Sequence, residues 1–526
     1  MVEHGRRPMS VEAGSVARTG TPRKRSGGAA ARRQARLKAP IVYPKSTIRN
    51  IPAYEVLAVD GLEAIDDRAM SILETIGIEF RDDVSADIWR HAGAEVDGHR
   101  VRIPRQLIRK LIASVPEEFD YHSRNPDRTV RVGGRNMVFG PAYGTPNLID
   151  LEGVRRQATA EDMRDLMKLH QVNPALQYNG GYTLEPMDVA IPHRHLHMVQ
   201  SSFQTTDKPI MGSPQSEYQA SDSIEMAKLV FGSDFVDQNV VMTAIFNCNS
   251  PLVWDKTQLD AIRVYAKENQ SLLMSPFVLY GASTPVHTLA ATAQIIAEVL
   301  AGIAFSQIIR PGCRAVMGVA PMGVYMKSGS PVFGSPEVSL FMYIFGQMAR
   351  YYGMPWRTNG AKSGSKQDDL YAGYDSILKV YPAILGGCNL LTHCGGTIEG
   401  SLCISMGKLA ADAQQILGFQ TLLKGVSFDD IDIALDDLAK VGPGGHFFDE
   451  DYTRENLPFL DDIQDNERFE SWKASGRKTV SDRGRAWCKS MLERYEEEPP
   501  TLDPGIAESL ADFVTRRESE IPAGIA

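Results

Sequence analysis

Short apolar runs alternate with helix-length amphipathic segments through the middle of this 526-residue chain. Eight runs share this character: 137–139, 176–178, 209–211, 240–245, 271–274, 314–317, 355–357 and 389–392. Parallel strands need a crossover connection, usually a helix, so a repeated strand–helix–strand pattern is typical of a parallel sheet. Eight repeats predict an α/β fold of the (β/α)8 TIM barrel type.

The segments between the runs have the length and apolar spacing of crossover helices. The clearest are 160–172, 216–231, 256–269, 286–309, 336–352 and 369–385. An open, doubly wound sheet is the alternative fold. It usually shows fewer strands and a glycine-rich phosphate loop, and no G-x-G-x-x-G or Walker A sequence follows any of these runs.

Helical additions are expected on both sides of the barrel. We predict a disordered basic tail at 1–40, a mostly helical N-terminal cap at 41–135, the barrel at 136–425 and a helical C-terminal extension at 426–526. The tail carries ten Lys or Arg and two Glu, a net charge of +8, so the remainder carries −17 of the total of −9. So acidic a body argues against nucleic-acid binding as the main function.

Composition favours a cytoplasmic protein. The hydrophobic share of 43% is that of a globular protein, and we identify neither a membrane-spanning run nor a secretory h-region. The six cysteines show no C-x-x-C pair and no regular spacing, which fits reduced thiols.

The stretch 386–399 combines the eighth run with His393, Cys394 and two glycines. Active sites of barrels lie where strands end, so His393 is a candidate site residue. A buried structural histidine is the alternative. Cys394 lacks an activating partner in the sequence and is predicted to pack as a small apolar residue.

Aromatic residues follow several predicted strands, with Glu185 close to one of them. They are Tyr143, Tyr182, Phe246, Tyr325 and Trp356. A quaternary ammonium group has a diffuse charge and no hydrogen to donate, so aromatic faces are its natural partners. The alternative is that these aromatics are ordinary core residues.

Three histidines at 193, 195 and 197 suggest a metal site, but they fall in a helix-like stretch that brings only His193 and His197 together. No Glu completes an H-E-x-x-H motif, so surface or capping roles are expected and no metal ligand is predicted.

Three segments resemble the trimethylamine:corrinoid methyltransferase family: 386–399, the loop 358–374, and Val-Gly-Pro-Gly-Gly-His-Phe at 441–447. The resemblance implies a barrel that moves a methyl group from an amine to the Co(I) of a separate corrinoid protein. The trimethylamine enzymes carry pyrrolysine near the position of 362–369, where this chain has only standard residues. That departure resembles the branch acting on glycine betaine. Tyr452 is a second departure, because it replaces the family's usual histidine.

With this resemblance we assign roles to the candidate residues. Tyr143, Tyr182, Phe246 and Tyr325 would form an ammonium cage, with Glu185 as its counter-charge. A carboxylate would be held by Asn249, Asn359 and His393. The corrin ring would approach Gly318, Gly360, Gly395 and Gly396, and no residue would act as a general acid or base.

We also expect a homo-oligomer, no tightly bound metal, and no nucleic-acid or membrane partner. Three alternative functions remain: a trimethylamine-type methyltransferase, a metal-dependent barrel hydrolase or lyase using His193 and His197, and a betaine-binding protein without catalysis.

Overall fold

The computed structural model describes residues 45–522 except 429–430, 449, 451–452 and 454–462. The predicted tail at 1–40 and Tyr452 lie outside the described residues.

A parallel sheet forms the centre of the molecule. Its strands are β7 (Asn136–Phe139), β10 (Ile210–Met211), β11 (Met242–Phe246), β13 (Ser271–Met274), β15 (Ala315–Gly318), β18 (Trp356–Asn359) and β19 (Leu390–Thr392). They pair in the order β10-β11-β13-β15-β18-β19-β7, always in parallel. Seven of the eight predicted runs are therefore strands of one sheet.

The remaining run, 176–178, closes this sheet into a barrel. On one side Gln177 N donates to Phe139 O of β7 at 2.9 Å, and on the other Asn179 N donates to Pro209 O, next to β10, at 2.9 Å. The run is too briefly paired to count as a strand, but it occupies the eighth place. The predicted (β/α)8 barrel is confirmed.

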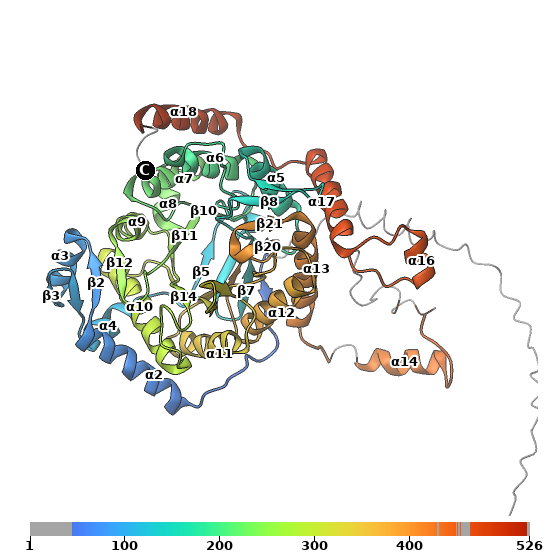
Figure 1. Ribbon diagram of the computed structural model, residues 1–526, viewed down its shortest axis with the longest axis horizontal. Coiled ribbons are helices and arrows are strands. Elements are labelled where there is room, and N and C mark those ends of the chain that lie inside the picture. Colours follow the sequence, from blue (N-terminus) through green and yellow to red (C-terminus); the bar gives the residue numbers. More distant parts are fainter. Residues whose placement is uncertain (1–44, 429–430, 449, 451–452, 454–462, 523–526) are drawn as a thin grey trace, which may run out of the picture. The chain divides into compact units, whose positions relative to one another are not determined.

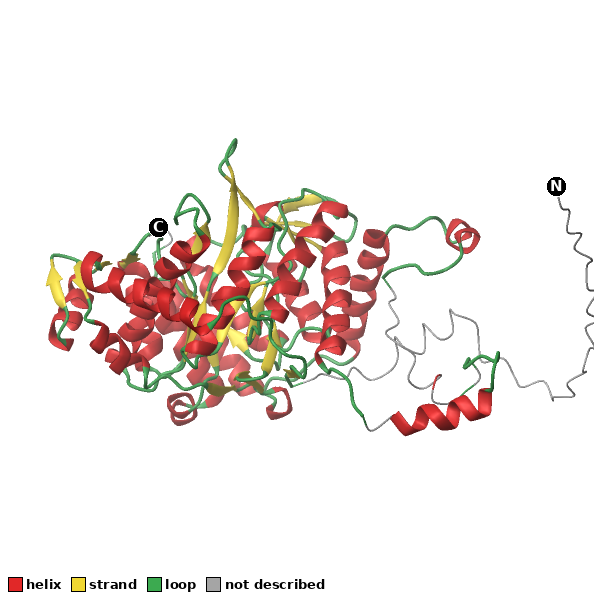
Figure 2. Cartoon of the chain, turned by 90° about the horizontal axis from the view of Figure 1, so that it is seen from below, coloured by secondary structure: helices red, strands yellow, loops and turns green. Residues whose placement is uncertain are grey.

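Eight helices surround the barrel, one after each run (Figure 1). They are α5 (Ala160–Val172), α6 (Arg194–Thr205), α7 (Glu217–Phe231), α9 (Lys256–Lys267), α10 (Thr288–Ile309), α11 (Pro336–Tyr351), α12 (Leu370–Leu385) and α13 (Met406–Leu423). Side chains at several first turns cap them: Thr159 and Asp162 form a capping box at α5, and Asp369 caps α12. In the perpendicular view the strands lie inside these helices (Figure 2).

Helix α10 is long and apolar enough to cross a membrane by length and composition alone. This segment corresponds to the crossover helix expected at 286–309, but the expectation that no apolar run has the length of a membrane span is wrong for it. In the structure, 83% of its apolar window is buried, and it packs against the neighbouring α9 and α11 and against N-terminal helices. It has the position of a core helix.

The N-terminal segment contains strands as well as helices. Strands β5 (Glu118–Tyr121) and β6 (Val130–Gly133) form an antiparallel hairpin that extends from β7. Phe119, Tyr121 and Val132 of this hairpin join one apolar cluster with interior barrel residues such as Leu273 and Val316. The hydrogen bond from His122 N to Val240 O, ahead of β11, places the hairpin at the N-terminal end of the barrel. That end is filled with apolar side chains.

The rest of this segment comprises α2 (Val59–Ser71), α3 (Asp83–Ala92), α4 (Arg105–Ile112) and four short strands, β1 (Thr47–Ile48), β2 (Ile78–Arg81), β3 (Glu95–Asp97) and β4 (Arg100–Arg102). Strand β1 pairs with β7, and β2 pairs with β12 (Val253–Asp255) in the connection after β11. The described residues from 45 onward accordingly belong to one compact unit.

Small sheets are built from the loops that follow barrel strands. One contains β8 (Asn147–Ile149), β9 (Arg155–Gln157), β20 (Thr397–Ile398) and β21 (Cys403–Ser405); another contains β14 (Phe277–Leu279), β16 (Ala320–Tyr325) and β17 (Ser330–Val332). Since β8 follows β7 and β20 follows β19, the first sheet joins two neighbouring strand ends. These sheets stiffen the loops at the C-terminal end of the barrel.

The described part of the segment after residue 425 consists of helices and their connections. It contains α14 (Ile431–Val441), α16 (Phe469–Ala474), α17 (Val480–Glu497) and α18 (Pro504–Glu520). Helix α17 packs against α13 and α5, and α18 against α6 and α7. All six cysteines are buried and unpaired, in agreement with reduced thiols.

Candidate active site at the C-terminal end of the barrel

Four neighbouring strand ends carry the candidate residues. Going around the barrel, the run 176–178 leads to Tyr182, β7 to Tyr143, β19 to His393, and β18 ends at Asn359. All strands are parallel, so these ends lie at the same end of the barrel, opposite the β5–β6 hairpin. This is the end at which barrel enzymes place their active sites.

Arg357 lies in the interior of the barrel just below these ends. Its Nη1 donates to Ser275 Oγ at 2.7 Å, and its Nη2 donates to Thr392 Oγ1. The guanidinium thus reaches residues next to β13 and on β19, although it is only 1% exposed. Among the described residues, no carboxylate lies within 4 Å of it, and its Nε has no partner.

Asn359 follows Arg357 by two positions on β18, so both side chains point to the same face of the sheet. That face is the barrel interior. Asn359 is fully buried, and neither its amide oxygen nor its amide nitrogen has a partner among the described residues. Buried amides in proteins are almost always hydrogen-bonded, so these two atoms are suited to contact a ligand.

His393 and Tyr143 form an aromatic pair, with ring centroids 4.6 Å apart and planes inclined by 34°. The backbone of His393 has φ +57°, a left-handed conformation, and its N–H donates to Pro141 O at 2.9 Å. Burial and the charges of Lys362, Arg357 and Lys379 hold the pKa of His393 well below its usual value. The imidazole is therefore neutral at pH 7, and its buried Nδ1 has no partner among the described residues.

Two lysines add positive charge to the same region. Lys362, in the loop after β18, is 6% exposed; burial and the Arg357 charge lower its pKa to about 7. Lys379, on α12, donates from Nζ to Pro321 O at 2.7 Å, and burial with the charges of Lys362 and Arg357 lowers its pKa far below the usual value. Arg357, Lys362 and Lys379, called here the cation cluster, were not assigned a role from the sequence.

Tyr182 and Glu185 lie on the other side of β7 from this cluster. Burial raises the pKa of the Tyr182 hydroxyl, which bonds Ser213. Burial also raises the pKa of Glu185, whose carboxylate lies 3.6 Å from the Arg194 guanidinium. An aromatic ring and a half-buried carboxylate therefore stand next to one another here.

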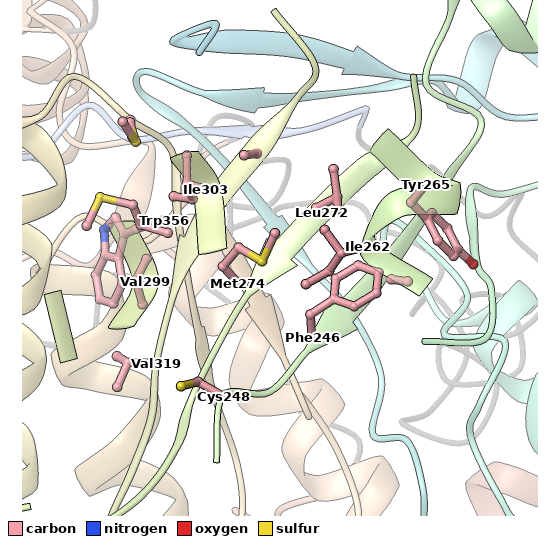
Figure 3. Packing of buried hydrophobic residues seen from close by; sticks show 14 of the residues in the cluster. Phe246, Cys248, Ile262, Tyr265, Leu272, Met274, Val299, Ile303, Val319 and Trp356 are labelled. Atoms are coloured by element: carbon pink, nitrogen blue, oxygen red, sulfur yellow. The ribbon is translucent and has the colours of Figure 1, made fainter. Parts of the chain in front are cut away.

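Three residues that were predicted to bind the ammonium or the carboxylate group lie outside this region. Phe246 packs in the core beside Tyr265, with ring centroids 5.6 Å apart (Figure 3). Asn249 is exposed, and its amide donates to Asp255 at 2.7 Å. Tyr325 is 51% exposed at the end of β16. Trp356 is a core residue, because on β18 it faces away from the barrel interior.

The predicted cofactor glycines are surrounded by protein atoms. A Cβ on Gly318 would lie 2.6 Å from Ser275 Cβ, one on Gly395 2.7 Å from Leu409 Cδ1, and one on Gly396 2.9 Å from Ile404 Cγ2. A Cβ on Gly360 would lie 3.1 Å from Thr392 O. The missing side chains thus allow strand ends and α13 to pack closely.

Two of the three clustered histidines bind the C-terminal segment, and the third binds α7. His193 Nε2 lies 2.7 Å from Ile521 O, His197 Nε2 lies 2.7 Å from Glu518 Oε1, and His195 Nε2 lies 2.8 Å from Asp222 Oδ2. Within the described ranges, no group of three or more His, Cys, Asp or Glu side chains is placed to hold a metal ion. The expected surface or capping role does not describe His195, which is buried on α6 and bonded to Asp222, while His193 and His197 join α6 to the C-terminal segment.

Comparison with known proteins places this arrangement in context. The chain is 34% identical over 475 residues to a glycine betaine methyltransferase of Desulfitobacterium hafniense, covering 90% of this chain and 98% of that protein. It is 24% identical to a trimethylamine methyltransferase of the same species, covering 88% and 93% of the two chains. An L-carnitine:corrinoid methyltransferase of Eubacterium limosum is 24% identical, with coverage of 87% and 96%.

The family profile described as trimethylamine methyltransferase (MTTB) matches residues 24–522, almost the whole chain and every part of the site described above. The protein therefore belongs to the trimethylamine methyltransferase family and is a methyltransferase.

Proposed function

We propose that this protein transfers a methyl group from a quaternary amine, glycine betaine or a close relative, to the Co(I) of a corrinoid carried by a separate protein. The observation that supports this most directly is the buried C-terminal end of the barrel, where Tyr143, Tyr182 and Glu185 stand on adjacent strand ends. The likeness to glycine betaine and carnitine methyltransferases supports the same reaction class.

The aromatic residues suit the ammonium end of such a substrate. A trimethylammonium group cannot donate a hydrogen bond, and the faces of Tyr143 and Tyr182 offer the cation–π contact that it can accept. Glu185 supplies a counter-charge, shared with Arg194. Phe246 and Tyr325 have no part in this proposal, because one is in the core and the other is exposed.

At the other end of the substrate, His393 and Asn359 face the barrel interior with unpaired polar atoms. Neither needs to exchange a proton. The neutral imidazole of His393 positions the substrate, and the Asn359 amide can donate a hydrogen bond. Asn249 is left out of the proposal, because its amide is bonded to Asp255 at the surface.

The chemistry needs alignment more than acid–base catalysis. The carbon–nitrogen bond breaks with its electron pair staying on nitrogen, so the leaving group is a neutral tertiary amine. Co(I) supplies the electron pair for the new bond to carbon. Holding nitrogen, methyl carbon and nucleophile in line contributes up to roughly 7–11 kcal/mol in favourable reactions. Charge is neutralised as the methyl group moves, so a water-excluding site favours the transition state.

The assay uses the purified protein with cob(I)alamin, kept reduced, and glycine betaine. We expect the corrin spectrum to change to that of methylcobalamin, with one dimethylglycine formed for each methyl group transferred. The variant His393→Ala should transfer methyl groups at least about tenfold more slowly, because a positioning contact is lost. Absence of methylcobalamin with glycine betaine and with every other quaternary amine tried would refute the function. An unchanged rate for His393→Ala would remove that residue from the site.

We further propose that the protein is a homo-oligomer. One side of α12 exposes six large apolar side chains: Leu370, Tyr371, Tyr374, Ile377, Leu378 and Tyr381. The two charged residues of this helix, Asp375 and Lys379, are both buried. An uncharged apolar surface of this kind suits a permanent interface between like subunits.

A further inference from the structure

The cation cluster has no anionic partner within reach. Among the described residues, no carboxylate lies within 4 Å of the charged groups of Arg357, Lys362 or Lys379. All three side chains are at least nine-tenths buried. Burying a charge without an opposite charge is costly, so a buried arginine on β18 with two buried lysines near it needs an explanation.

The buried acids nearby are engaged with other groups. Asp375 accepts hydrogen bonds from Gly334 N at 3.0 Å, Ser363 Oγ at 2.8 Å and Gly364 N at 2.9 Å. Asp412 pairs with Lys408 at 2.6 Å and accepts from Gly396 N at 2.8 Å. Both carboxylates hold loops in place. Neither carboxylate pairs directly with a member of the cluster, so the place of a direct negative partner is left for a ligand.

The three side chains differ in whether their hydrogen-bond donors already have a protein partner. Arg357 donates to Ser275 and Thr392, and Lys379 donates to Pro321 O, so their positions are fixed by the protein. The Lys362 ammonium makes no hydrogen bond with any described residue; only its backbone N–H is engaged, with Gly360 O at 2.7 Å. Of the three, Lys362 is the group with all its side-chain donors available.

Buried polar atoms without a hydrogen-bond partner indicate a ligand in the same place. Asn359 has two unpaired amide atoms, His393 has an unpaired Nδ1, and Arg357 has an unpaired Nε. The three side chains are essentially buried, and they come from β18 and from the residue after β19. Such donors next to a cation cluster form a site for an oxyanion of carboxylate size.

We propose that Arg357 and Lys362 bind the carboxylate of the substrate, and that Lys362 makes the enzyme select quaternary amines that carry one. This inference rests on the proposed function. It also accounts for where the charged groups lie in the site. Arg357 extends from β18 to Thr392 on β19, whereas Tyr182 and Glu185 follow the run 176–178 beyond β7. The cation cluster and the Glu185 carboxylate, which is paired with Arg194, therefore lie on different sides of the pair Tyr143–His393. A zwitterion with a carboxylate at one end and trimethylammonium at the other matches this arrangement, whereas a simple cation such as tetramethylammonium has no negative charge to offer Arg357 and Lys362.

Direct binding, without corrinoid, tests the inference. We would titrate the full-length protein with glycine betaine and with its carboxamide, which keeps the trimethylammonium group but has no negative charge. Wild type should bind glycine betaine at least about tenfold more tightly. In Lys362→Met the dissociation constant for glycine betaine should rise about 10- to 100-fold, the effect of losing one charge-assisted hydrogen bond, and that for the carboxamide should change by less than about threefold.

Lys366→Met is the matched control. It removes a positive charge from the same loop, but Lys366 is exposed and donates to Gly364 O. Its affinities should equal those of wild type. Equal weakening of both ligands in Lys362→Met, or a wild type that binds both ligands alike, would overturn the inference. The second comparison needs no variant, so it decides even if Lys362→Met fails to fold.

The outcomes separate this inference from the proposed function. A protein that binds glycine betaine through Lys362 but forms no methylcobalamin refutes the methyl transfer and leaves the carboxylate site standing. A protein that transfers methyl groups equally well from glycine betaine and its carboxamide keeps the function and refutes the carboxylate site.

Discussion

A buried lysine with no partner reduces the stability of the protein that contains it. Lys362 lies in low-dielectric surroundings beside Arg357, and both effects favour its neutral form. Residues held in unfavourable states are concentrated at functional sites, where a ligand compensates for them. Lys362 has this character, because a bound carboxylate would supply the charge that the chain does not.

The pH dependence of stability should reveal this lysine. The pKa of Lys362 is about 7 in the folded protein, below its usual 10.5. Between these values the unfolded chain binds one proton more than the folded protein, so stability rises with pH, by at most about 1.4 kcal/mol per pH unit. Below pH 7 both states carry the proton, so Lys362 causes no further change of stability with pH, and the full cost of its buried charge is present. We expect Lys362→Met to be more stable than wild type at pH 6 and to gain less stability between pH 7 and pH 9.

Urea unfolding at pH 6, 7, 8 and 9 measures this difference. Lys379 also has a lowered pKa, so some rise with pH should remain in the variant. Lys366→Met should follow the wild-type curve. A Lys362→Met curve parallel to that of wild type would show that Lys362 does not titrate in this range.

The site was only partly predictable from single residues. Strand ends in a barrel converge, so the sequence predicts that five residues lie near one another, and the structure places them on adjacent ends: Tyr143, Tyr182, Glu185, Asn359 and His393. Phe246 was misplaced because a strand alternates its side chains: Ile245 faces the barrel interior and Phe246 faces the helices.

No role was predicted for Arg357, because it is the last residue of the run 355–357 and an arginine at that place looks like the end of a strand. In the structure β18 continues to Asn359. The signal that could have found it is its alternation with Asn359: two polar residues, two positions apart, at the end of a buried strand. Lys362 and Lys379 carry no such signal. Their burial arises from how the loop after β18 folds back against α12.

At the scale of elements, helix α18 depends on a network of ion pairs. Arg517 Nε lies 2.7 Å from Asp222 Oδ1 on α7, and His195 Nε2 on α6 lies 2.8 Å from the other oxygen of that carboxylate. One buried side chain thus links three helices. Burial lowers the pKa of His195, so the imidazole is neutral at pH 7 and its contact with Asp222 is a hydrogen bond.

Replacing Asp222 by Ala should loosen α18 selectively. The change leaves Arg517 and the buried His195 without their acceptor, at a cost of about 1–3 kcal/mol. We expect amide hydrogen exchange in 504–520 to accelerate by about 10- to 100-fold, while exchange in the barrel strand β13 is unchanged. Glu520→Ala, which removes only an exposed partner of Arg517, serves as the control. Equal protection of α18 in the Asp222→Ala variant and wild type would contradict the assigned role of Asp222.

The barrel itself was predictable because its signal is repeated eight times. Seven of the expected runs and the helices that follow them agree with the observed limits to within a few residues. The run 176–178 takes the eighth place through its backbone bonds to Phe139 and Pro209 without forming a strand. The β5–β6 hairpin was not expected, although its sequence carries a strand signal: Phe119 and Tyr121, like Val130 and Val132, stand two positions apart with a charged residue between them. The apolar side chains of the hairpin fill the barrel interior.

At the scale of the whole molecule, the exposed side of α12 bears on how many chains form the active enzyme. Helix α12 begins directly after the loop that carries Lys362, so its exposed side lies close in sequence to the site. An apolar patch of this extent on a separate chain would favour association and aggregation. A stable interface between subunits would cover it and would hold the Lys362 loop from outside.

Light scattering coupled to size-exclusion chromatography should therefore give wild type a mass that is a multiple of one chain. Tyr374→Glu places a charge in the middle of the exposed side of α12, and we expect it to dissociate the oligomer, because an unpaired charge is costly inside an apolar interface. Val84→Glu is the matched control, since Val84 is an equally exposed apolar residue on helix α3. Its mass should equal that of wild type.

If wild type elutes as a monomer, the α12 surface is not a subunit interface. If Tyr374→Glu remains oligomeric, the subunits meet elsewhere. Dissociation with unchanged glycine betaine affinity would show that the interface covers α12 without shaping the substrate site.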